Sequence, residues 1–169
     1  MKLRKATVSE FDGIYREMQK NFIPEEIRDY ESAREVMKED GYSLYHVLCD
    51  DIRVGFITVW ELSEFAFVEH FVIYADFRNK GLGERTLALL KDKYDKILLE
   101  AEPPENEIKS RRISFYKRCA FHENIYEYFQ PPYRKGDCGT RLVLLSYPNV
   151  LSDFESAKKQ IYKDVYKIY

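Results

Sequence analysis

Three consecutive segments between residues 44 and 74 most constrain the fold of this chain. Residues 44–49, 54–61 and 65–74 are rich in valine, isoleucine and aromatic residues, which is typical of β-strands. The turns between them, at Asp50-Asp51 and at residues 62–64, are far shorter than the crossover of about a dozen residues that parallel strands need. The sequence therefore predicts an antiparallel meander of three strands.

Helices and further strands flank this meander. Before it we expect a short strand over residues 2–6, an amphipathic helix from Phe11 to Phe22 and a second helix that begins at Pro24 and ends at Gly41. After the meander the pattern predicts two helices alternating with strands: a helix over 81–94, a strand over 97–101, a helix over 108–119, and candidate strands over 121–129 and 140–147.

The last twenty residues predict a separate amphipathic helix. Ser152 and Glu155 have the spacing of a capping box. One face of this helix is an apolar stripe that must pack against another surface. The stripe consists of Leu151, Phe154, Ala157, Ile161, Val165 and Ile168. We expect residues 148–169 to pack on the domain formed by residues 1–147, or on a second copy in a homodimer.

Composition and charge exclude several classes of protein. With 27 basic and 29 acidic residues in 169, the chain lacks the basic excess of a nucleic-acid binder. Charged residues interrupt every apolar run before the roughly 18 residues of a membrane span, and residues 1–7 lack the apolar stretch of a signal peptide. Three scattered cysteines suit a reducing compartment. We expect a cytoplasmic protein with neither a nucleic acid nor a membrane as its partner.

The segment from residue 68 to residue 84 carries a chemical signal. A strand runs into a short loop, and Gly81 and Gly83 open a helix. The first amides of a helix lack internal acceptors and carry the positive end of its dipole, and Arg78 and Lys80 add positive charge. This pattern predicts a phosphate cradle, with a simple strand-to-helix turn as the alternative. It is neither a dinucleotide fingerprint nor a P-loop, because the glycine spacing differs from both.

Residues 78–83, Arg-Asn-Lys-Gly-Leu-Gly, resemble the R/Q-x-x-G-x-G/A motif of the GCN5-related N-acetyltransferase (GNAT) superfamily. Residues 68–73 resemble that family's fourth strand, and residues 113–121 resemble its helix that ends in Tyr followed by Gly-Phe, with Ala120 in place of the glycine. The resemblance covers about residues 1–147. It implies an α/β (α+β) fold with a mixed, mostly antiparallel central sheet of six to seven strands flanked by helices, to which the C-terminal helix is added.

The resemblance also implies the activity: transfer of the acetyl group of acetyl-CoA to a primary amine of a small molecule or a protein. The oxyanion donor would be the backbone amide of Val72 or of its neighbour. No metal is expected, because Cys119 and His122 supply only two of the four ligands of a structural zinc site. The residues implied to bind CoA are Phe71, Val72 and Ile73 along the pantetheine arm, and Arg78, Asn79, Lys80, Gly81, Leu82, Gly83 and Glu84 around the pyrophosphate.

Two side chains are the candidates for proton transfer. Glu69 is expected to act as the general base through a water molecule, since apolar neighbours should raise its pKa. Tyr116 is expected to act as the general acid for the departing thiolate. His70 follows Glu69 on a strand, so we expect it to point to the opposite face as a packed histidine.

Several assignments stay open at this point. Asn106 lies farther from Tyr116 than the family's usual asparagine, and Arg111 and Arg112 either contact the 3′-phosphate of CoA or form a solvated helix face. The aromatic loop over residues 128–133 either lines the acceptor pocket or is a connection stiffened by proline. A non-catalytic acyl-CoA-binding sensor or scaffold, and an unrelated interaction module, are the alternative functions.

Overall fold

A mostly antiparallel sheet forms the centre of the computed structural model, which describes residues 1–134 and 136–168. The strands of the described residues follow the order β1-β2-β3-β4-β5-β8-β6, with β7 paired to β8, and β4–β5 is their one parallel pair. The predicted fold class is confirmed, with eight strands where six to seven were expected. The strands are β1 (Lys2–Lys5), β2 (Tyr42–Cys49), β3 (Ile52–Glu61), β4 (Ala66–Ile73), β5 (Ile97–Ala101), β6 (His122–Glu123), β7 (Tyr128–Gln130) and β8 (Thr140–Tyr147).

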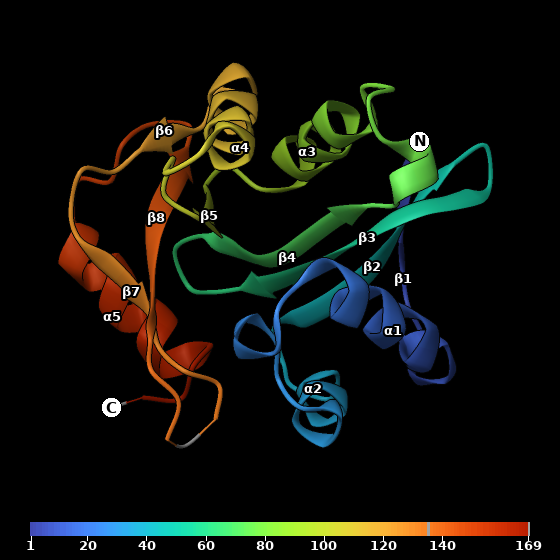
Figure 1. Ribbon diagram of the computed structural model, residues 1–169, viewed down its shortest axis with the longest axis horizontal. Helices are drawn as coiled ribbons and strands as arrows, with labels where there is room; N and C mark the ends of the chain where they lie inside the picture. The colour runs from blue at the N-terminus through green and yellow to red at the C-terminus, as the bar shows by residue number, and fades with distance from the viewer. Residues whose placement is uncertain (135, 169) are drawn as a thin grey trace.

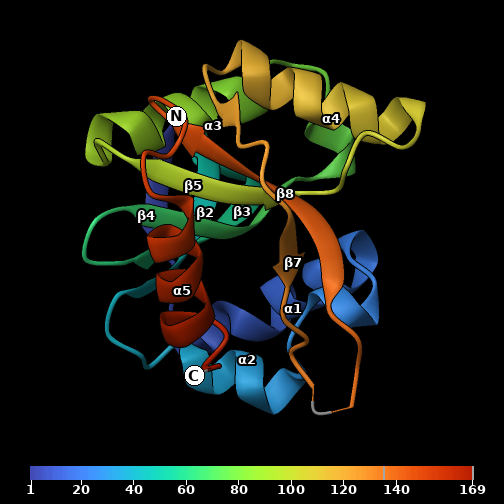
Figure 2. The same cartoon turned by 90° about the vertical axis from the view of Figure 1, so that its left-hand side faces the viewer.

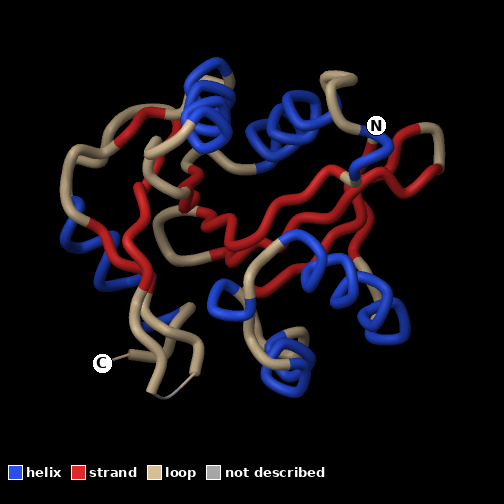
Figure 3. The backbone as a smooth tube through the Cα atoms, in the orientation of Figure 1, coloured by secondary structure: helices blue, strands red, loops and turns tan. Residues whose placement is uncertain are grey.

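Helices cover both faces of the sheet. Helices α3 and α4 lie on one side and α1 and α2 on the other, while α5 runs beside β7 and β8 (Figures 1 and 2). The same layers, with the strands between them, are visible in the backbone trace of Figure 3. The helices are α1 (Phe11–Asn21), α2 (Tyr30–Val36), α3 (Leu82–Lys93), α4 (Glu107–Arg118) and α5 (Phe154–Asp164), and the 3₁₀ turns are η1 (Val8–Glu10), η2 (Pro24–Glu26) and η3 (Ala75–Phe77).

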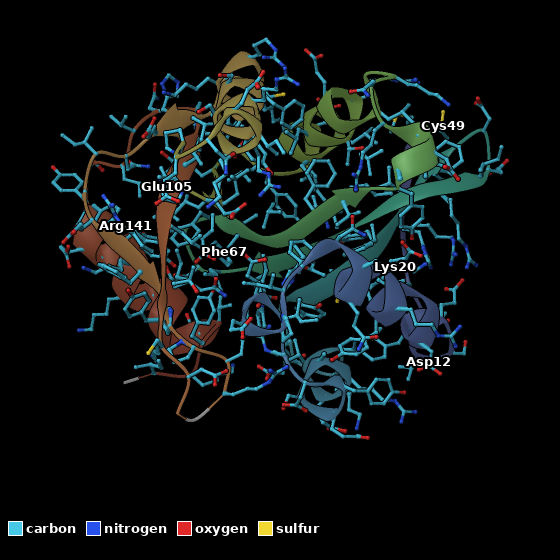
Figure 4. The ribbon with its side chains drawn as sticks, viewed as in Figure 1. Asp12, Lys20, Cys49, Phe67, Glu105 and Arg141 are labelled. Atoms are coloured by element: carbon cyan, nitrogen blue, oxygen red, sulfur yellow. The ribbon has the colours of Figure 1, made fainter. Side chains whose placement is uncertain are left out.

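The sheet separates two apolar cores, because successive strand residues point to opposite faces. Phe67, labelled near the middle of the sheet in Figure 4, is fully buried on the α1 side, and the next residue, Val68, is buried on the α3 side. A central strand that is buried on both faces has a nearly continuous run of apolar residues in its sequence. This is why the meander was visible in the sequence.

Helix α5 packs on the sheet of its own chain. Phe154, Ala157 and Ile161 belong to the same buried cluster as Phe67 and Leu144. The expected cap was wrong: Asp153, not Ser152, is the N-cap, and its carboxylate accepts the Ser156 N–H at 2.9 Å. A contact between two copies of the chain stays a prediction.

Two predicted elements are interrupted in the structure. The helix expected from Pro24 onward is a 3₁₀ turn followed by α2, whose N-cap Asp29 accepts the Ser32 N–H at 3.0 Å. This interruption frees Arg28 to turn towards the sheet. The strand expected over residues 121–129 is broken into β6 and β7, and Ile125 between them is 92% exposed.

Within the described ranges, no helix combines the length and the apolar character that crossing a membrane would require.

Candidate active site

Strands β4 and β5 pair over a short distance and then separate. Their parallel register runs from Ala66–Ile97 to Val68–Leu99, and β4 continues beyond it to Ile73. A cleft of about 1460 Å³ lies where they part, lined by the end of β4, the end of β5, the start of α3 and one side of α4. The split sheet therefore places a strand edge and a helix N-terminus along one cavity.

The separated part of β4 offers main-chain donors to this cleft. The N–H groups of His70 and Tyr74 donate to β3, at 2.8 and 2.9 Å. Because N–H groups alternate between the two edges of a strand, the Val72 amide also faces β3, and the amides of Phe71 and Ile73 face the cleft. Of the amides expected for the oxyanion, those next to Val72 face the cleft and that of Val72 does not; the role of donor stays a prediction.

The loop before α3 has the geometry of an anion site. Gly81, its N-cap, has φ 69°, a left-handed conformation that favours glycine. The first helical bond runs from the Arg85 N–H to the Gly81 carbonyl, so the amides of residues 82–84 lie ahead of it without helical acceptors. Gly83 is needed for helix packing. A Cβ at this position would lie 3.1 Å from the Phe115 ring, so the lack of a side chain lets α3 approach α4.

The two basic side chains of this loop are placed differently. Arg78 lines the cleft, where it donates to the Ile73 carbonyl at 2.9 Å and to the Asn21 amide oxygen at 2.7 Å. Lys80 donates to the Asp76 carbonyl at 2.9 Å and is not among the described residues that line the cleft. A contact between Lys80 and CoA therefore stays a prediction.

A β-bulge sets the position of Glu69. Val59 pairs with Val68 and Thr58 pairs with His70, so Glu69 is an extra residue in β4. The bulge puts the side chains of Glu69 and His70 on the same side of the sheet, with His70 Nδ1 3.9 Å from Glu69 Oε2. The expectation that His70 points to the opposite face was wrong.

Glu69 is a buried, paired carboxylate. Its side chain is 1% exposed and accepts hydrogen bonds from Arg28, from the Tyr133 hydroxyl at 2.8 Å and from the Trp60 indole N–H at 3.0 Å. Burial raises the pKa of Glu69, but Arg28 and the other donors outweigh burial and leave that pKa below its ordinary value. The expected rise in pKa was wrong, because Arg28, 41 residues away in the chain, pairs with the carboxylate.

A second carboxylate, Glu100, lines the cleft from the facing strand. It accepts hydrogen bonds from the hydroxyls of Tyr128 and Tyr166, the latter at 2.8 Å. Burial raises the pKa of Glu100 to about 7 although the two hydroxyls act against the rise, and the charge of Glu69 adds to it. Glu100 was not among the candidates predicted from the sequence, although it is the one acid inside the apolar strand over residues 97–101.

Tyr116 lines the cleft from α4 and is 8% exposed. Burial raises its pKa to about 12, so the phenol is protonated at neutral pH. In the described part of the chain its hydroxyl has no hydrogen-bond partner, whereas those of Tyr128, Tyr133 and Tyr166 donate to glutamates. A phenol without a partner is available as a donor to a ligand.

The remaining candidates from the sequence have separate positions. Asn106 is the N-cap of α4 and accepts the Lys109 N–H at 2.9 Å, a structural role. Arg111 and Arg112 line the cleft, each paired with a glutamate. Ala120 has φ 58° and tolerates the left-handed conformation at the position where the motif has glycine.

The aromatic loop contributes in part. Gln130 and Tyr133 line the cleft, and Phe129 is exposed. Among residues 1–134 and 136–168, no group of three or more His, Cys, Asp or Glu side chains is arranged to hold a metal ion.

Comparison with known proteins shows which family the chain belongs to. The profile of the Acetyltransferase (GNAT) family matches residues 10–121. The chain belongs to this family. A GNAT-family acetyltransferase from Bacteroides thetaiotaomicron superposes with a TM-score of 0.91 at 33% identity, over 100% of both chains. The predicted resemblance is therefore confirmed.

Two further comparisons support the GNAT fold. The Bacillus subtilis (strain 168) protein YjbC, named as an acetyltransferase, is 27% identical over 157 residues, which cover 90% of this chain and 80% of YjbC. The structure of an aminoglycoside 6′-N-acetyltransferase complexed with coenzyme A superposes with a TM-score of 0.63 at 14% identity, over 90% of this chain and 100% of that one. At that identity the likeness shows the fold alone.

Proposed function

We propose that this GNAT protein transfers the acetyl group of acetyl-CoA to a primary amine. The observation that carries the proposal is the gap between β4 and β5, which joins the amides of Phe71 and Ile73 to the N-terminus of α3 in one cleft. Family membership supports acyl transfer, and a protein of the same fold is complexed with coenzyme A.

The cleft suits the parts of acetyl-CoA in order. The amides of residues 82–84 and the positive end of α3 suit the pyrophosphate, with Arg78 beside them. The free edge of β4 suits the pantetheine amides, which would pair with it like an added strand. The amide of Phe71 or Ile73 would then donate to the carbonyl oxygen as negative charge develops on it.

We assign the general base to Glu100. A base works best when its pKa lies near the operating pH, and the pKa of Glu100 is about 7. Glu69 lies across the gap with its pKa lowered and its oxygens occupied by Arg28, Tyr133 and Trp60, which makes it a weaker proton acceptor. When two carboxylates differ in this way, the environment separates their roles. Glu69 as the base stays a prediction that the same assay tests.

The proposed reaction is a direct attack of the amine on the thioester. The nitrogen lone pair of the neutral amine forms a bond to the thioester carbon, the carbonyl electron pair moves onto the oxygen, and Glu100 takes the proton that this nitrogen loses, directly or through water. The C–S bond of the tetrahedral intermediate then breaks, and the thiolate takes a proton from the Tyr116 hydroxyl. Solvent restores the proton of Tyr116, and Glu100 releases its proton to solvent.

Calorimetric titration with CoA and thiol release across a panel of amines test the activity. We expect heat of binding and turnover with at least one amine. Binding of CoA without thiol release from acetyl-CoA would favour the non-catalytic sensor. Absence of binding would contradict the proposal.

Variants separate the two carboxylates. We expect Glu100→Gln to lower kcat by about 10²-fold or more with the Kd for CoA unchanged. Glu61→Gln is the matched control, because Glu61 also accepts a tyrosine hydroxyl, from Tyr94 at 2.5 Å, but outside the described lining of the cleft. Full activity of Glu100→Gln together with loss of turnover in Glu69→Gln would transfer the base role to Glu69.

The amine itself, the cytoplasmic location and a homodimer stay predictions. The amine panel tests the first, microscopy of the tagged protein the second, and light scattering of the intact chain the third.

A further inference from the structure

The residues that follow α5 contact Glu100, which lines the cleft, and Arg28, the partner of Glu69. The Tyr166 hydroxyl donates to Glu100 Oε2 at 2.8 Å, and the Val165 carbonyl accepts from Arg28 at 2.8 Å. Two consecutive residues near the end of the chain thus contact the Glu100 carboxylate and the cation that pairs with Glu69. Both lie outside residues 10–121, the part that the family profile matches.

This C-terminal segment, residues 165–168, is fixed in place by the rest of the chain. Val165 is 1% exposed and Tyr166 is 8% exposed. Lys167 adopts φ 58°, pairs with Glu39 at 2.6 Å and lies 5.3 Å from the centre of the Trp60 ring. The burial and the contacts of this segment show that it packs as part of the domain.

We propose that Tyr166 is a positioning residue of the active site, which orients the Glu100 carboxylate from outside the described lining of the cleft. This rests on the proposed function, since it assigns Tyr166 to the base of that reaction. Tyr166 acts on Glu100 and is not itself a partner of the reacting atoms.

The two carboxylate oxygens of Glu100 are held by different hydroxyl groups. Tyr128 donates to Oε1 and Tyr166 donates to Oε2, so the carboxyl plane is held from two elements. A hydroxyl that donates to a carboxylate favours its charged form, which opposes the effect of burial. Without Tyr166, Glu100 is both freer to rotate and harder to ionise.

Other groups around Glu100 act in different ways. The Tyr133 hydroxyl donates to Glu69 and the Tyr162 hydroxyl to the Phe129 carbonyl, so neither donates to Glu100. The charged and titratable groups that face Glu100 are Glu69 from β4, Arg28 from the segment before α2, Tyr128 from β7, Tyr133 from the loop after β7, and Tyr162 and Tyr166 from the C-terminal helix and segment.

The test compares Tyr166→Phe with wild type in the full chain. Phenylalanine keeps the ring, which packs 5.3 Å from that of Tyr133, and removes only the hydroxyl. Tyr94→Phe is the matched control, because it removes a hydroxyl that donates to another glutamate, Glu61, outside the described lining of the cleft. Tyr128→Phe removes the second donor to Glu100 and provides an independent variant.

Two readouts are used. Carbon-13 NMR of the glutamate carboxyl carbons, with the Glu100 signal assigned from Glu100→Gln, follows ionisation without turnover. The pH profile of kcat/KM follows it during the reaction. In Tyr166→Phe we expect both midpoints to rise by about one pH unit, since a hydrogen bond to a charged group has that worth. From a midpoint near 7 this lowers kcat/KM at pH 7 about fivefold, with recovery at higher pH and an unchanged Kd for CoA.

The outcomes separate this inference from the proposed function. A rise in both midpoints for Tyr166→Phe and for Tyr128→Phe, with Tyr94→Phe like wild type, supports the positioning role. An unchanged Glu100 titration, or an equal loss of activity at every pH, overturns it while leaving the acetyltransferase proposal intact. The Glu100 midpoint measured by NMR could rise in a protein that releases no thiol from acetyl-CoA with any amine of the panel. That result overturns the catalytic role of Glu100 and with it the assignment of Tyr166 to an active site.

Discussion

Replacing Arg28 by methionine tests the buried ion pair of the cleft. The side chains of Arg28 and Glu69 are 10% and 1% exposed, so methionine fills a similar volume but leaves a carboxylate buried without its cation. The Val165 carbonyl also loses the donor that held it at 2.8 Å. We therefore expect a loss of stability and not only a local change at the cleft.

The magnitude follows from this burial. Removal of one partner of a buried pair costs about 3–5 kcal/mol in the free energy of unfolding. For a chain of this length each kcal/mol lowers Tm by about 2–4 °C, so the melting temperature should fall by about 10 °C. Urea denaturation at pH 7 measures the free energy directly.

The sign of the pH dependence gives a second check. In wild type the pKa of Glu69 is below its ordinary value, so the pair stabilises the fold above that ordinary pKa, and this stability is lost as pH falls through the folded pKa. In Arg28→Met burial acts without the cation, so the folded pKa moves above the unfolded one and the strain is relieved as pH falls. The stability gap between the two proteins should therefore be largest near pH 7 and shrink towards pH 5.

The control for this prediction is the same substitution at an exposed pair. Arg111 and Glu107 are both 77% exposed, and Arg111→Met should cost no more than about 0.5 kcal/mol. If Arg28→Met cost as little, or if its deficit did not shrink on acidification, the reasoning about a desolvated ion pair would be refuted. The double variant Arg28→Met with Glu69→Gln should recover part of the loss.

Three further outcomes follow from the structure. Tyr116→Phe should lower kcat by about 10²-fold with the Kd for CoA unchanged, and a full rate in the thiol-release assay would remove its role as the acid. Gly55→Ala would place a Cβ 2.2 Å from the Val72 carbonyl oxygen, so urea denaturation should show a loss of about 2–3 kcal/mol; a wild-type midpoint would argue against this packing. Ala120→Gly relieves a left-handed φ of 58° and should raise the free energy of unfolding by about 0.5–1 kcal/mol, whereas a lower value would show that the turn is not strained.

The sequence predicted the elements whose signals are local. The strand over residues 97–101 and the strand over 140–147 have the predicted bounds, because turn residues and prolines delimit short β-rich runs. The break between β6 and β7 was missed because Ile125 and Tyr126 have strand-like side chains although they are exposed. Residue type indicates what a strand can bury, but only the packing decides what is buried.

The partners of the buried carboxylates in the cleft could not be predicted from the sequence, for another reason. Arg28 meets Glu69 across 41 residues, and Tyr166 meets Glu100 across 66. Such pairs depend on how elements pack, so no spacing in the sequence announces them. The turn into α3, by contrast, lies within residues 78–84, where the sequence predicted that glycines open a helix, and the left-handed conformation of Gly81 is what the structure adds.

The bulge in β4 has a consequence for how the strand is constructed. If Glu69 is left out, the other seven residues of Ala66–Ile73 alternate without a fault: Ala66, Val68, Phe71 and Ile73 on the α3 side, and Phe67, His70 and Val72 on the α1 side. Glu69 is thus the extra residue of the bulge, and strand pairing and the alternation of faces continue on either side of it. The bulge adds one polar side chain to β4 and leaves unchanged the face of the sheet to which each following residue points.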